Sequence, residues 1–226
     1  MKADVLEQIV DDYLKFNGYF TTHNVVFRPS KDHPDYDTAK DGGYSDVDVL
    51  GHHPNPPKGR HRVVVVSCKA WQDGFNTSAE LAALRRGGKS HGKDAWKSFR
   101  ELWVPKWSEA FHTTVTSLTG ESTFSYQIAV TYLRGIATAQ TWAQDPIVKS
   151  NLRGCGFSFL TLEEMGGTML KELTTAPASS EIGRLAQLLR AAGLTASEQV
   201  SEPMGPVPGS AAALAEEAEN LEEDAT

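Results

Sequence analysis

An apolar run that ends in a lysine constrains this chain more than any other feature. Residues 62–70 read RVVVVSCKA, in which consecutive side chains are apolar instead of alternating with polar ones. Successive side chains of a strand point to opposite sides, so a strand of this kind has to be covered on both faces. We therefore predict a central strand in a sheet with helices on both faces, which is an α/β fold.

Hydrophobic periodicity and turn residues predict the elements around that strand. The predicted helices cover residues 3–16, 78–86, 94–111, 138–151, 163–173 and 179–192. The predicted strands cover residues 19–27, 45–51, 62–70, 125–135 and 156–162. Ser78 is the expected N-cap of its helix. The segment between Pro29 and Gly43 is charged and rich in helix and strand breakers, so we expect a surface loop there.

The acidity of the chain is concentrated at its C-terminal end. The formal net charge is −7, and residues 201–226 hold seven acids and no Lys or Arg, which leaves 22 acids against 22 bases in residues 1–200. Because this end offers almost nothing to bury, residues 196–226 are expected to be an acidic disordered tail. The expected organisation is a domain over residues 1–175, a C-terminal helix over 176–195 and the tail.

Composition also excludes several classes of protein. No apolar run reaches the roughly 20 residues that span a bilayer, and the start carries acids where a signal peptide has its apolar stretch. Two cysteines are too few for a disulfide framework, and no HxxxH, HExxH or GxSxG arrangement indicates a zinc enzyme or a serine hydrolase. We expect a cytoplasmic protein without a membrane partner.

Two neighbouring predicted strands carry ionisable groups. In SDVDVLG, alternation places Asp46 and Asp48 on one face and the two valines on the other. In VVVVSCKAW, Ser67 and Lys69 share a face. A buried ammonium is costly unless a carboxylate or an anion lies close to it, so we expect Asp48 to be near Lys69.

These residues resemble a known family. Glu7 in a first helix, Asp48 in SDVDVLG and a strand ending in Ser67-Cys68-Lys69 are similar to the PD-(D/E)XK nuclease superfamily over residues 3–165. The closest likeness is to its Mrr-like and RecB-like branches, where a D-V-D-V-L strand precedes a V-V-E-C-K-S-W strand. The resemblance implies a restriction-endonuclease-like mixed central sheet flanked by helices on both faces. It also implies Mg²⁺-dependent hydrolysis of phosphodiester bonds, with DNA a more probable substrate than RNA.

The resemblance implies a role for each matching residue. Asp48 would bind the metal, Glu7 would complete its shell directly or through water, and Asp46 is a further candidate ligand. Lys69 would orient or activate the attacking water and stabilise charge on the phosphate. Mg²⁺, for which Mn²⁺ can substitute, is a hard cation that takes carboxylate, water and phosphate oxygens. The implied setting is restriction, defence or repair, and dimeric relatives make a homodimer a further expectation.

The chain departs from the family pattern at Ser67, where the family has Asp or Glu. Some restriction endonucleases of the superfamily have a serine there and supply the carboxylate from the helix that follows. Glu80 or Asp73 are the candidates for that part in this chain. The alternative is a degraded nuclease-fold domain that binds nucleic acid or a protein without catalysis.

A basic segment follows the lysine strand. Residues 85–106 contain seven Lys and Arg side chains against two acids, interleaved with aromatic residues around a glycine-rich loop. Such bases suit contact with phosphates, because the release of counterions drives the binding. Arg86, Lys89 and Lys93 are the expected contacts, joined by Gln72, whereas the tryptophans are expected to pack in the core. A further hypothesis is that the acidic tail mimics DNA and covers this segment.

Overall fold

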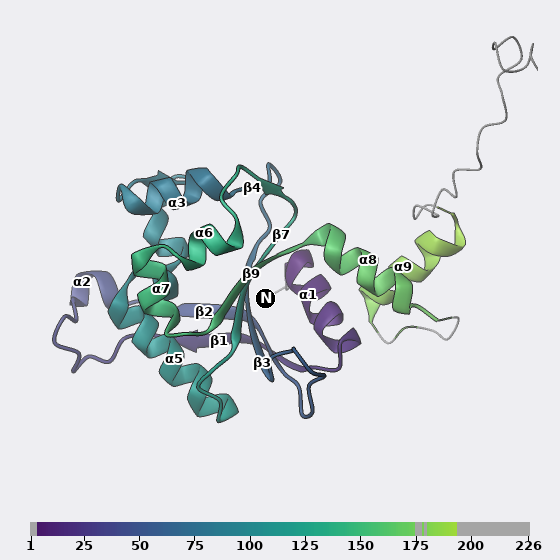
Figure 1. The fold of residues 1–226 in the computed structure, drawn as a ribbon, viewed down its shortest axis with the longest axis horizontal. Helices are drawn as coiled ribbons and strands as arrows, with labels where there is room; N and C mark the ends of the chain where they lie inside the picture. Colours follow the sequence, from purple (N-terminus) through teal and green to yellow (C-terminus); the bar gives the residue numbers. More distant parts are fainter. Residues whose placement is uncertain (1–3, 175–177, 179, 194–226) are drawn as a thin grey trace, which may run out of the picture. The chain divides into compact units, whose positions relative to one another are not determined.

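The computed structural model describes residues 4–174, 178 and 180–193. Within them a five-stranded mixed sheet has the order β1-β2-β3-β7-β9 (Figure 1). Its strands are β1 (Phe20–Phe27), β2 (Ser45–His52), β3 (Val63–Lys69), β7 (Ser125–Val130) and β9 (Gly156–Thr161). The pairs β1–β2 and β2–β3 are antiparallel, and the pairs β3–β7 and β7–β9 are parallel. The predicted mixed sheet is confirmed.

Helices cover both faces of the sheet (Figure 1). On one face lie α1 (Val5–Phe16) and α8 (Leu162–Glu172), which contact each other. The other face is covered by α3 (Thr77–Arg85), α4 (Arg100–Trp103), α5 (Pro105–Thr119), α6 (Ala139–Ala143) and α7 (Pro146–Leu152). Side chains of β3 enter both cores: Val65 packs with the larger cluster and Val66 with the α1 cluster. The strand is central and buried on both faces, as its composition predicted.

Replacing Trp107 on α5 tests how much the packing of the larger core contributes to stability. Its ring has no exposed surface, and its Nε1 donates a hydrogen bond to Asp41 at 3.0 Å. We expect Trp107→Ala to lower the free energy of unfolding by about 3–5 kcal/mol, because a large cavity replaces the ring. Denaturant titration measures the change. Leu118→Ala, at a 60% exposed position of the same helix, is the control, and equal losses in both variants would contradict this assignment.

The expected surface loop before β2 contains a short helix, α2 (Thr38–Asp41), so that prediction was incomplete. Asp41 is 1% exposed and forms an ion pair with Lys106 at 2.5 Å. Burial raises the pKa of Asp41, but hydrogen bonds from Lys106, a backbone amide and Trp107 outweigh it and hold the pKa below its ordinary value. A buried charge therefore anchors this polar segment to α5.

Several predicted elements are divided in the structure. The expected helix over 94–111 is a 3₁₀ turn (Ala95–Ser98) followed by α4 and by α5, which begins at Pro105, where a missing N–H is tolerated. The helix expected over 138–151 is likewise divided, at Pro146. The strand expected to reach residue 135 ends at Val130, and β8 (Leu133–Arg134) pairs instead with β4 (Phe75–Asn76).

Asn76, not the expected Ser78, caps the N-terminus of α3, because its side chain accepts a hydrogen bond from the Ala79 amide. The glycine-rich stretch after α3 forms a small hairpin of β5 (Lys89–Ser90) and β6 (Lys93–Asp94). The two residues at its turn both have positive φ angles, 47° and 78°, which the twist of a two-residue hairpin favours.

The C-terminal helix predicted after the sheet is present as α9 (Glu181–Ala191). Just before it, Ser180 Oγ donates a hydrogen bond of 2.5 Å to the buried Asp12 on α1. Within the described residues, one compact unit extends to Gln187. The expected acidic tail, residues 196–226, lies outside the described residues. None of the helices in the described part of the chain combines the length and apolar character that crossing a bilayer requires.

Candidate active site

The candidate residues lie where β2 and β3 separate. The last backbone pair between the two strands is Val49 with Val66. Beyond that pair, the Cys68 N–H donates to Asp48 Oδ2 at 2.6 Å instead of to a main-chain carbonyl of β2. A carboxylate thus takes the place of a ladder acceptor, and the two strands diverge around it.

The backbone opposite Asp48 on β1 is also irregular. Asn24 has a φ of 51°, in the left-handed region, and lies between the regular pairs His23–Val49 and Val25–Val47. Across this irregularity Val47 packs in the larger cluster and Val49 in the α1 cluster. The prediction that both valines share one face was therefore wrong, because regular alternation fails at Asp48.

Ser67 and Lys69 lie on one face of β3, as predicted. Lys69 Nζ donates a hydrogen bond of 2.8 Å to Ser67 Oγ and lies 5.6 Å from the centroid of the Phe99 ring. Ser67 is buried, whereas Lys69 is half-buried and has donors to spare. The charge of Lys69 and a hydrogen bond with Ser67 both lower the pKa of Asp48, so the structure brings these three residues together.

Negative charge accumulates around Asp48. Burial raises the pKa of Asp48 above its ordinary value. The charge of Lys69 and the hydrogen bond from the Cys68 amide lower this pKa, but they do not outweigh burial, and the charge of the exposed Asp46 raises it further. Burial also raises the pKa of Glu7 on α1, and the charge of Asp48 is the next largest cause. Glu7 therefore lies close enough to Asp48 for the two carboxylates to repel each other.

Two buried residues that sequence reasoning missed belong to this cluster. Glu101 on α4 accepts a hydrogen bond from the hydroxyl of Tyr126 on β7. Burial raises the pKa of Glu101, while the charge of Lys69 is the largest lowering effect. Burial and Glu101 together hold the pKa of Tyr126 well above its ordinary value, and a hydrogen bond with Ser67 acts in the opposite direction. The only signal in the sequence was an acid among aromatic residues.

The acids that sequence reasoning offered in place of a motif carboxylate have other partners. Glu80 is buried and accepts a hydrogen bond from Ser90 Oγ at 2.7 Å, with His91 of the hairpin at 3.8 Å. Asp73 pairs with Arg134 at 3.3 Å in an exposed position. Besides Asp48, Glu101 is an acid whose charge interacts with Lys69.

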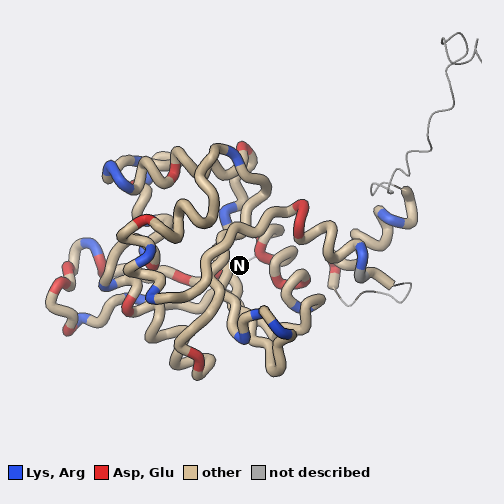
Figure 2. Tube along the Cα trace, in the orientation of Figure 1, with Lys and Arg blue, Asp and Glu red and all other residues tan. Residues whose placement is uncertain are grey.

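The expected nucleic-acid contacts lie beside the end of β3. Arg86, Lys89, Lys93 and Gln72 are all exposed. The hairpin that carries the two lysines packs against the chain just beyond Lys69, since the His91 ring lies 3.9 Å from the Trp71 ring, centroid to centroid. Figure 2 shows basic and acidic positions interspersed along the described chain, with basic positions where α3 leads into this hairpin.

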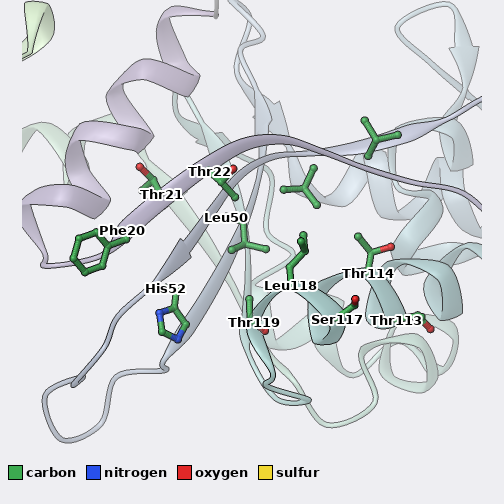
Figure 3. Close-up of a pocket in the computed structure, with 12 residues that line it drawn as sticks. Phe20, Thr21, Thr22, Leu50, His52, Thr113, Thr114, Ser117, Leu118 and Thr119 are labelled. Atoms are coloured by element: carbon green, nitrogen blue, oxygen red, sulfur yellow. The ribbon is translucent and has the colours of Figure 1, made fainter.

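The expectation that the tryptophans pack in the core is confirmed for the buried Trp107, and Trp96 and Trp103 pack partly buried against the same cluster. A groove of about 840 Å³ lies between α5 and the β1–β2 pair (Figure 3), and its lining includes Phe20, Leu50 and Leu118 but no residue predicted for the site.

The donor chemistry fits a hard divalent cation with few protein ligands. Across the described residues, no group of three or more His, Cys, Asp and Glu side chains is arranged to hold a metal ion. Asp48 and Glu7 nevertheless supply two carboxylates that repel each other, and a cation relieves such repulsion. Mg²⁺ commonly takes one or two carboxylates and fills its remaining positions with water and substrate phosphate.

Comparison of the chain with protein-family models, with curated proteins and with solved structures gave no match.

Proposed function

We propose that this chain is a metal-dependent nuclease that hydrolyses phosphodiester bonds, with DNA preferred over RNA as the substrate. The observation that carries the proposal is the convergence of Asp48, Ser67 and Lys69 where two strands separate. The mixed sheet with helices on both faces agrees with the fold that the resemblance to the PD-(D/E)XK superfamily implies.

Each side chain has a distinct part in the proposed reaction. Asp48 and Glu7 would hold Mg²⁺, which when bound lowers the pKa of a water molecule and neutralises charge on the phosphate. Lys69 uses one of its three N–H donors on Ser67 Oγ and directs the others to the attacking water and a phosphate oxygen. Ser67 thereby orients Lys69 without itself acting as a metal ligand.

In this proposal, Glu101 supplies the negative charge near Lys69 that the missing motif acid would otherwise supply. Its carboxylate interacts with the charge of Lys69, and the hydrogen bond from Tyr126 fixes its position. A negative group beside the lysine offsets the cost of holding a positive charge in a half-buried site. Glu101 acts through Lys69, so it is a positioning residue.

Substitutions of two buried glutamates test the role assigned to Glu101. We expect Glu101→Gln to slow Mg²⁺-dependent cleavage by about 10–100-fold, the usual effect of losing a group that positions a catalytic residue. Glu80→Gln is the parallel variant, because its side chain is similarly buried but faces the hairpin. Initial cleavage rates on folded proteins decide between them. A larger loss in Glu80→Gln would instead make Glu80 the compensating acid.

The proposed function is tested on purified full-length protein with supercoiled plasmid, single-stranded DNA and RNA. We expect cleavage in Mg²⁺ or Mn²⁺ that stops in EDTA, with DNA cut faster than RNA. Absence of cleavage of all three substrates with either metal would overturn the proposal.

A degraded nuclease-fold domain is the second candidate, and the neutral Ser67 at the motif position is the observation that favours it. Such a domain binds nucleic acid equally well with and without divalent metal, and Ser67→Glu leaves it inactive. Metal-dependent cutting by the wild-type chain excludes this candidate.

A further inference from the structure

A second group of aromatic and cationic side chains lies at the start of β2. Tyr44, immediately before β2, is 61% exposed. The Arg28 guanidinium lies over its ring, 4.9 Å from the centroid, and Arg28 Nη1 also donates to the Tyr44 hydroxyl at 3.2 Å. The other cationic contact comes from α4, where Arg100 Nη1 donates to the Tyr44 carbonyl at 3.1 Å.

Arg100 joins this tyrosine to a second aromatic residue. Its guanidinium carbon lies 5.7 Å from the centroid of the half-buried Trp96 ring, and Lys97 Nζ lies 5.5 Å from the same ring. We call this set the Tyr44 platform; it comprises Arg28, Tyr44, Trp96, Lys97 and Arg100. The chain has thus brought together residues from the end of β1, the start of β2, the 3₁₀ turn and α4.

Acids offset part of the positive charge of the platform, since Glu101 and Asp41 both interact with Arg100. Asp94 pairs with Lys97 at 2.9 Å, which neutralises that lysine. Asp41 pairs with Lys106 at 2.5 Å on the adjoining α5. Arg28 is exposed, and within the described part of the chain it contacts the neutral Tyr44. An exposed ring with a guanidinium over one face is a surface that suits an anionic ligand with a planar group.

The platform is close to the proposed catalytic residues. Tyr44 precedes Asp48 by four residues of extended chain, which corresponds to about 13 Å. On the other side, Arg100 is adjacent in sequence to Glu101, which interacts with Lys69. A nucleic-acid strand advances about 3.4 Å per nucleotide when its bases are stacked, so the separation corresponds to roughly four nucleotides.

We propose that the Tyr44 platform binds an unpaired nucleotide of a nucleic-acid strand, with a base stacked on the Tyr44 ring and a phosphate at Arg28. This inference rests on the proposed nuclease function, and it adds that the strand is single-stranded a few nucleotides from the cleavage site. An exposed π-face selects an unpaired base, because the faces of paired bases are covered by their neighbours in the duplex.

Fluorescence anisotropy of a labelled 12-nucleotide oligo-dT in EDTA tests the platform without any cleavage. We expect Tyr44→Ala to weaken binding about tenfold, as the loss of one base–aromatic stack does, and Tyr44→Phe to retain it. Phe20→Ala is the matched control, because Phe20 is 73% exposed at the opposite end of the same two strands. That variant is expected to bind as the wild type does.

The salt dependence of binding distinguishes the proposed phosphate contact of Arg28 from the stacking of a base on Tyr44. We expect Arg28→Gln to reduce the slope of log affinity against log salt by about 0.7, the value for one phosphate of a single strand, and Tyr44→Ala to leave the slope unchanged. The control is Arg62→Gln, whose guanidinium pairs with Glu121 near the other end of the sheet. Equal binding by Tyr44→Ala and the wild type, or tighter binding of a 12-base-pair duplex than of oligo-dT, would overturn the platform.

The binding and cleavage experiments together distinguish failure of the platform proposal from failure of the proposed nuclease function. Tyr44-dependent binding of oligo-dT without cleavage of any substrate supports the platform and refutes the nuclease. Metal-dependent cleavage with no effect of Tyr44→Ala on binding refutes the platform alone.

Discussion

Replacing Lys69 with methionine is expected to reduce the rate of Mg²⁺-dependent cleavage by about 10²–10³-fold, the range typical of removing a donor that stabilises charge developing in the transition state. Methionine keeps an apolar stem against Phe99 but removes every N–H donor from the site. The attacking water and the phosphate oxygen then lose their direct contact with a cation. Single-turnover cleavage at saturating protein measures the chemical step without the contribution of binding.

Lys58→Met is the control for this variant, since Lys58 is exposed in the connection between β2 and β3. Cleavage by Lys58→Met at the wild-type rate shows that the loss of one positive charge is not the cause. If Lys69→Met keeps more than a tenth of the wild-type rate, Lys69 is not the catalytic lysine.

Replacing Asp48 with asparagine is expected to abolish metal-dependent cleavage and at the same time to stabilise the folded protein at neutral pH. The amide oxygen of asparagine can still accept the hydrogen bond from the Cys68 N–H, so local geometry is retained. The neutral group is a poor ligand for Mg²⁺, which is why activity is lost. Stability should increase because the folded environment disfavours the charged form of Asp48.

The sign of the stability effect follows from the raised pKa of Asp48. Its pKa in the folded chain lies above the ordinary value of 3.8, so the folded state binds the proton more tightly than the unfolded state does. The penalty for the charge is complete above the folded-state pKa and disappears as the pH falls below 3.8. Asp48→Asn should therefore unfold at higher denaturant than the wild type at pH 7, with the difference shrinking toward pH 3.

Denaturant titrations at several pH values measure this difference, with Asp46→Asn as the comparison at an exposed neighbour. A destabilised but inactive Asp48→Asn protein would indicate a structural carboxylate. Stabilisation together with loss of activity is the signature of a group kept for function at a cost in stability.

The sequence was sufficient to predict the sheet because its strands carry strong local signals. The run from Val63 to Val66 requires apolar cover on both faces, and the structure has two separate cores there. The same alternation argument placed Ser67 beside Lys69 correctly. It failed at Val47 and Val49, opposite the left-handed Asn24. Asparagine tolerates this conformation better than most residues, but the strand pattern alone did not indicate that Asn24 would adopt it.

The composition of the site was only partly predictable, for a similar reason. Asp48 and Lys69 belong to adjacent strands, so a local pattern could bring them together. Glu101 and Tyr126 reach the site from α4 and β7, which are distant in sequence from both. Their approach depends on how helices pack over the sheet, and Pro105, which begins α5, determines where α4 ends and a new helix starts.

The most direct test of the central claim is cleavage of supercoiled plasmid in Mg²⁺ by three folded proteins measured side by side: the wild type, Asp48→Asn and Lys69→Met. We expect the wild type to cut, both variants to be inactive at the same protein concentration, and EDTA to stop the wild-type reaction. Cleavage by either variant at the wild-type rate, or no cleavage by the wild type, would contradict a nuclease centre built on these two residues.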